Sequence, residues 1–138
     1  TEFVIYMTET DHQRLLSLLD QAVGASDPRL RGDLRRLAQG VREARIVKPE
    51  AIPSDVVTMN SEVVVHDPDS GETDTWIITF PNEADVSRQR ISVLSPLGSA
   101  LLGRRKGETV EWSTGVGTGR VVITDITFQP EAAGRFDL

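Results

Sequence analysis

The 138-residue sequence contains no cysteine, only two histidines, and few aromatic side chains, which make up 5% of the chain. Without cysteine, the chain has no disulfide framework, no thiolate metal site and no thiol nucleophile. His12 and His66 are far apart in the sequence, and neither has a second metal ligand at a useful spacing, so we expect no metal and no cofactor. No serine stands in a nucleophile-elbow context. Together these absences argue against a catalytic site.

Long apolar runs are also absent, as is a basic-then-apolar pattern in the first residues. The first absence predicts that no helix spans a membrane, and the second predicts no signal peptide. We therefore expect a cytoplasmic protein that works without a membrane. The chain is 38% hydrophobic and 26% charged, which at this length predicts one domain or a small domain with an appendage.

The net charge of −6 argues against generic binding to nucleic-acid backbones, so we expect no direct DNA binding. The charge is uneven, because residues 27–48 have a local balance of +4, which leaves −10 for the remainder. A basic arm on an acidic body indicates an oriented approach to a charged partner. The alternative is that these arginines only solvate the outer face of a helix.

The first 48 residues predict an antiparallel helical hairpin. Apolar side chains recur at helical spacing after Thr8 or Thr10, and a second such series follows Asp27 as N-cap and Pro28 at the first helical position. Two helices joined by so few residues must lie antiparallel. The predicted tip of the hairpin contains Asp27, Arg29, Arg31 and Asp33. Residues 3–7 are β-prone and predict a short leading strand.

The rest of the chain predicts a small sheet. Residues 49–55 contain two prolines and are interpreted as a linker. Within residues 56–138, strands are expected at 56–66, 73–80, 91–94, 109–113 and 120–128, with turns at 67–71 and 115–119. One short helix follows the third strand. The predicted fold class is α+β: a helical hairpin, then an antiparallel sheet carrying one short helix.

The most informative stretch covers residues 91–107 and reads ISVLSPLGSALLGRRKG. Ser95 can cap the short helix, Pro96 suits its first position, and Gly103 is placed to end it in a left-handed conformation. The plain interpretation is a helix that covers the sheet. Taken with IPSDVVTMNS at 52–61 and QPEAAG at 129–134, however, the stretch resembles the regulator of nucleoside diphosphate kinase (Rnk) family. That family shares its C-terminal domain with the Gre transcript-cleavage factors.

The resemblance implies an FKBP-like sheet-and-helix fold for residues 56–138. It also implies a binding segment, because Gre-type domains bind a coiled coil of the polymerase β′ subunit at the rim of the secondary channel. The matching segment here consists of Leu94, Ser95, Pro96, Leu97 and Gly98. Ser95 and Pro96 match the family's Ser-Pro pair. Leu94 stands where Gre factors commonly carry a polar or acidic residue.

Gre hairpins enter the secondary channel, where acidic tip residues help to hold a catalytic magnesium ion. Asp27 and Asp33 are near the tip here, but the neighbouring arginines would repel a divalent cation, and the hairpin is short. The Rnk resemblance likewise implies no stimulation of cleavage. Our hypothesis is a non-catalytic, monomeric regulator that binds bacterial RNA polymerase and competes with Gre factors. The alternatives are a cleavage factor that uses both aspartates and an FKBP-like prolyl isomerase, which would need an aromatic-lined apolar pocket.

Overall fold

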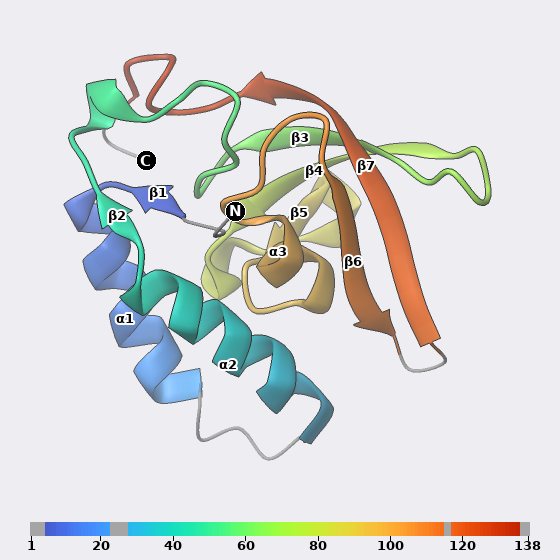
Figure 1. Cartoon of the computed structure of the whole chain (residues 1–138), viewed down its shortest axis with the longest axis horizontal. Helices are drawn as coiled ribbons and strands as arrows, with labels where there is room; N and C mark the ends of the chain where they lie inside the picture. Colours follow the sequence, from blue (N-terminus) through green and yellow to red (C-terminus); the bar gives the residue numbers. More distant parts are fainter. Residues whose placement is uncertain (1–4, 23–27, 115–116, 136–138) are drawn as a thin grey trace.

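The helical hairpin forms as predicted and is closed at its base by a pair of short strands. A computed structural model describes residues 5–22, 28–114 and 117–135. Helix α1 (Glu9–Ala22) and helix α2 (Pro28–Arg42) lie side by side in Figure 1. Thr8 caps α1, because its Oγ1 accepts a hydrogen bond of 3.2 Å from the Asp11 backbone. The strands β1 (Tyr6–Met7) and β2 (Arg45–Ile46) pair in parallel.

Five strands form the main sheet, in the order β5-β4-β3-β7-β6. Their bounds are Glu62–His66 for β3, Thr73–Thr79 for β4, Arg90–Ser92 for β5, Thr109–Thr114 for β6 and Gly117–Phe128 for β7. The pairs β3–β4, β3–β7 and β6–β7 are antiparallel, whereas β4–β5 is parallel. The α+β class is therefore confirmed, with one parallel pair in a sheet predicted to be antiparallel.

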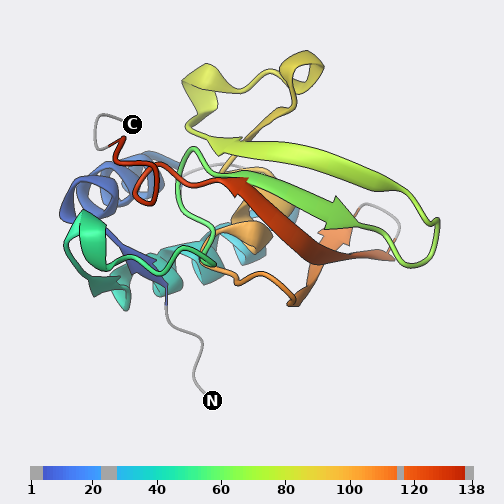
Figure 2. The same ribbon diagram turned by 90° about the horizontal axis from the view of Figure 1, so that it is seen from above.

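Helix α3 (Pro96–Leu101) lies between the sheet and the hairpin (Figure 1). The hairpin gathers at one end of the sheet, and the turn joining β3 to β4 projects at the other (Figure 2). Leu15 of α1, Val41 of α2, Leu101 of α3 and Ile123 of β7 are each 0% exposed within one hydrophobic cluster. The hairpin and the sheet therefore share a core. None of the helices in the described residues is both long enough and apolar enough to cross a membrane.

The prediction for residues 49–66 needs correction, because the strand begins six residues later than expected. Asn60 adopts a left-handed conformation with φ of 65°, and the Thr58 backbone donates to the Ser61 hydroxyl at 2.9 Å, so an irregular turn precedes β3. The stretch interpreted as a linker has structure of its own, because Pro49–Ala51 forms a 3₁₀ turn and Ile52 is buried. The division of the chain into a hairpin, a linker and a C-terminal domain, at residues 48 and 55, stays a prediction.

Candidate functional site

The segment 94–98 comprises the end of a tight turn after β5 and the first turn of α3. The Ser92 carbonyl oxygen accepts from the Ser95 backbone at 2.9 Å and from the Ser95 hydroxyl at 2.6 Å. The Ser95 Oγ in turn accepts from the Gly98 backbone at 3.0 Å. Ser95 is therefore the N-cap, and Pro96 occupies the first helical turn, as predicted. Because one hydroxyl both donates and accepts, it fixes the turn against the end of β5.

Gly98 has a steric role that sequence reasoning did not explain. A Cβ atom at this position would lie 2.1 Å from the Ser92 carbonyl oxygen and 2.9 Å from the Ser95 Oγ. The turn can be this tight only because residue 98 has no side chain. Gly103 ends α3 with φ of +82°, as predicted, and a Cβ there would meet the Ile5 side chain at 2.6 Å. Ile5 thus wedges the N-terminal strand against the end of α3.

The side chains of the segment are half-buried. Leu94, Ser95, Pro96 and Leu97 are all partly exposed, while Gly98 is buried. Leu94 and Leu97 also pack against the hydrophobic core, which holds them in place. The segment therefore offers a pre-formed surface of apolar groups around one hydroxyl, and such a surface loses little conformational freedom on binding.

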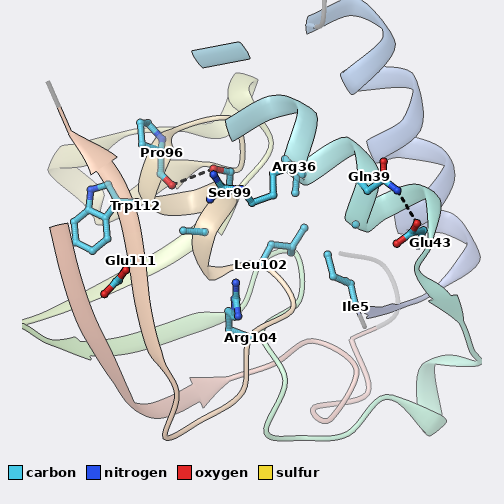
Figure 3. A pocket seen from close by; sticks show the side chains of 13 residues that line it. Ile5, Arg36, Gln39, Glu43, Pro96, Ser99, Leu102, Arg104, Glu111 and Trp112 are labelled. Carbon is cyan, nitrogen blue, oxygen red and sulfur yellow. Dashed lines mark hydrogen bonds between the residues drawn. The ribbon is translucent and has the colours of Figure 1, made fainter. Parts of the chain in front are cut away.

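A cleft of about 260 Å³ opens beside this segment, between α2, α3 and β6 (Figure 3). Its apolar lining includes Leu37 of α2, Leu102 just after α3 and Trp112 of β6. Pro96 and Ser99 line it from α3, and the Ser99 hydroxyl donates to the Pro96 carbonyl oxygen at 3.0 Å. The Trp112 indole lies against Gly119 of β7, where an added Cβ would come within 2.4 Å of the ring. No local pattern in the sequence indicates this cleft, because three separate elements form it.

The hairpin tip is only partly covered by the described residues. Asp27 lies outside them, and for Arg29, Arg31 and Asp33 only the backbone, in the first turns of α2, is described. Across residues 5–22, 28–114 and 117–135, no group of three or more histidine, aspartate or glutamate side chains could hold a metal ion. Exposed cations continue along α2 beyond the tip, at Arg35, Arg36 and Arg42.

Two carboxylates lie where α1 meets the C-terminal residues, and sequence reasoning missed both. Asp11 is 3% exposed and pairs with Arg14, whose guanidinium lies 4.7 Å from the centre of the Phe80 ring. Burial raises the pKa of Asp11, although Arg14 lowers it. Glu131 accepts from the Thr58 hydroxyl at 2.6 Å, and burial raises its pKa as well, with Asp11 adding to the effect. Of these contacts, that of Arg14 with Phe80 joins the hairpin to the end of β4.

The QPEAAG motif supplies a second junction, within the C-terminal part of the chain. The Gln129 side-chain amide donates to the carbonyl oxygens of Pro53 and Val56, at 2.8 and 2.7 Å. Glu131, two residues later, makes the bond to Thr58. The motif therefore ties the end of β7 to the stretch that precedes β3. Two of the motifs noted in the sequence, at 52–61 and 129–134, are in direct contact.

Comparison with known proteins supports a common origin for these features. Residues 52–128 match the family described as "Transcription elongation factor, GreA/GreB, C-term". The "Regulator of nucleoside diphosphate kinase" of Escherichia coli (strain K12) is 34% identical over 137 residues, covering 96% of this chain and 95% of that protein. The "Transcription elongation factor GreA" of Desulfovibrio desulfuricans is 37% identical over 144 residues, covering 88% of each chain.

A solved structure shows the same fold. The "Prokaryotic transcription elongation factor GreA/GreB from Nitrosomonas europaea" superposes with a TM-score of 0.75 and 35% sequence identity. The match covers 90% of this chain and 99% of that one, so it extends over both the hairpin and the sheet. The chain therefore belongs to the regulator of nucleoside diphosphate kinase family and carries the C-terminal domain of the GreA/GreB transcription elongation factors.

Proposed function

We propose that the chain is a non-catalytic transcription regulator that binds bacterial RNA polymerase in the cytoplasm, as a monomer. The segment Leu94–Gly98 makes the principal contact, at the β′ rim of the secondary channel. The observation that carries this proposal is the turn held by Ser95 within a domain of the GreA/GreB family. Its rigidity favours binding because little freedom is lost on docking.

The hairpin supports competition with Gre factors without stimulation of cleavage. With 14 and 15 residues, its helices reach only about 21–23 Å at 1.5 Å per residue. Asp27 and Asp33 are the acidic residues near the tip, and they share that region with Arg29 and Arg31. A divalent cation needs a surplus of anionic oxygen ligands, which this mixture does not supply. Binding at the rim therefore blocks a Gre factor but leaves the cleavage reaction unassisted.

A prolyl isomerase receives less support. The cleft beside α3 has one aromatic ring among the described residues that line it, Trp112. An apolar pocket for proline would need several such walls, as the sequence-based hypothesis required. Any effect on nucleoside diphosphate kinase would be indirect, through transcription, and would not require this chain to contact the kinase.

The first experiment measures binding of the purified chain to core RNA polymerase, with a GreA protein titrated as competitor. We expect binding below roughly 10 µM and displacement by GreA. The double variant Ser95→Asp, Pro96→Ala should bind at least tenfold more weakly, whereas Val86→Asp should bind like the wild type. Val86 is 68% exposed in a loop between β4 and β5, so it controls for the added charge. Unchanged affinity of the double variant would refute the assignment of residues 94–98 as the docking segment.

The second experiment measures transcript cleavage in stalled elongation complexes, with GreA as the positive control. We expect no cleavage above background from this chain, and less cleavage by GreA when the chain is present in excess. Cleavage that disappears in an Asp27→Asn, Asp33→Asn variant would instead establish the cleavage-factor alternative.

A further inference from the structure

We propose that the cleft between α2, α3 and β6 is the anchor pocket of the docking surface. It takes one bulky apolar side chain of the polymerase, and Arg36 on its rim pairs with a carboxylate next to that side chain. The inference rests on the proposed function and extends it, because it assigns part of the docking surface to the hairpin rather than to the C-terminal domain alone.

The cleft continues directly from the docking segment. Pro96 belongs to both, and Ser99 lines the cleft one helical turn further along α3. A partner that binds residues 94–98 would therefore also contact the cleft, because the two surfaces are continuous. Figure 3 shows Pro96, Ser99 and Trp112 on one side of the cleft and Arg36 on the α2 side, while Gln39 is turned toward Glu43.

The size and lining of the cleft fit a side chain. Its volume of about 260 Å³ lies below the roughly 300–1,000 Å³ of clefts that hold drug-sized ligands. Leu37, Ala100, Leu102 and Trp112 give it an apolar floor. Interfaces concentrate their binding energy in a few large side chains that fill such pockets near the centre of the contact. The Trp112 indole already packs against Gly119, so the floor of the cleft needs no rearrangement to receive a side chain of the partner.

On the α2 side of the rim the charges favour an acidic neighbour for that side chain, whereas Glu111 lies across the cleft on β6. Arg104 pairs with Glu108 at 3.5 Å, and Glu43 accepts from the Gln39 side chain at 2.6 Å. Arg36 is exposed and, within the described part of the chain, forms no ion pair. A carboxylate placed beside the cleft would gain a partner without displacing an existing one. Arginine is also the cation most often found among the dominant residues of interfaces.

The test compares Arg36→Glu with Arg35→Glu in binding to core RNA polymerase. Both residues are exposed, adjacent and on the same helix, but only Arg36 lines the cleft. We expect Arg36→Glu to weaken binding at least tenfold and Arg35→Glu to change it less than threefold. A third variant, Ser99→Trp, fills the cleft from α3 and should also weaken binding at least tenfold. Thermal melting checks that each variant is folded. If Ser99→Trp does not fold, the comparison of Arg36→Glu with Arg35→Glu still decides the test.

A direct readout uses Trp112, because the chain contains only two tryptophans. In a Trp76→Phe variant labelled with 5-fluorotryptophan, the chemical shift of the single ¹⁹F resonance of Trp112 should change when polymerase is added. Equal affinity of the two arginine variants, together with an unchanged resonance, would overturn the inference while leaving the docking segment intact. Failure of the wild type to bind would overturn the proposed function and, with it, this inference.

Discussion

Replacement of Gly98 by alanine should destabilise the fold, although the same change usually stabilises a helix. Removing glycine from a helix interior gains about 1 kcal/mol on average. Here the new Cβ would lie 2.1 Å from the Ser92 carbonyl oxygen. That oxygen cannot retreat, because Thr79 of β4 pairs with Ser92, and the Thr79 carbonyl oxygen accepts from Val93 at 2.8 Å. Helix α3 must move instead.

The movement would break the two hydrogen bonds of the Ser95 hydroxyl, to the Ser92 carbonyl oxygen and from the Gly98 backbone. Each contributes about 0.5–1.5 kcal/mol, so we expect a net loss of about 2 kcal/mol in the free energy of unfolding once the strained contact is included. For a chain of this size, the loss lowers the Tm by roughly 6–10 °C in calorimetry.

A control for this variant is Ser99→Ala, one residue further along α3. It removes only the hydrogen bond to the Pro96 carbonyl oxygen, and should lower the Tm by less than about 5 °C. Polymerase binding should fall with Gly98→Ala, because the turn that positions Pro96 is distorted. A Gly98→Ala protein that melts at or above the wild-type Tm would refute the steric argument.

Three further predictions concern contacts around the base of the hairpin. Ile5→Ala, measured by urea unfolding, should cost about 2–4 kcal/mol, because Ile5 is 3% exposed, whereas Ile5→Val should cost less than about 1.5. Gly103→Ala should also destabilise, but the Ile5→Ala, Gly103→Ala double variant should lose less than the sum, since the new Cβ meets the Ile5 side chain; strict additivity would contradict this. Glu131→Gln keeps the acceptor for Thr58 and removes a carboxylate whose pKa is raised by burial, so ionisation at neutral pH disfavours the folded state. Its Tm relative to wild type should be highest near neutral pH, and this advantage should disappear as the pH falls through the raised pKa toward the ordinary value of 4.5. An advantage that grows on acidification would oppose this account.

The sequence predicted those elements whose signals are local. Ser95, Pro96 and Gly103 define the start and end of α3 through capping chemistry, which acts within a few residues. The two helices of the hairpin followed from apolar spacing. In the same way, residues 94–98 could be proposed as a binding segment from sequence, because they form one continuous stretch.

Long-range features escaped prediction for the same reason. Nothing local marks Arg45 as a strand residue, because its pairing depends on Tyr6. The strand β7 starts before Arg120, at glycines that argue against a strand, because Gly119 provides the space for Trp112. The cleft has walls from α2, α3 and β6, so Arg36 gains its significance only from the packing of the hairpin.

The parallel pair β1–β2 has a consequence for how the protein assembles and varies. The Arg45 backbone donates to the Ile5 carbonyl oxygen at 2.9 Å, and Val47 donates to Met7 at 3.0 Å, so a clasp holds both ends of the hairpin. Closing so long a loop is entropically unfavourable, so the helices should form before the clasp. The clasp also makes the attachment of the hairpin independent of its length, because helical turns inserted beyond the clasp would lengthen the hairpin without changing its base. Within one architecture, the length of the hairpin is thus free to vary.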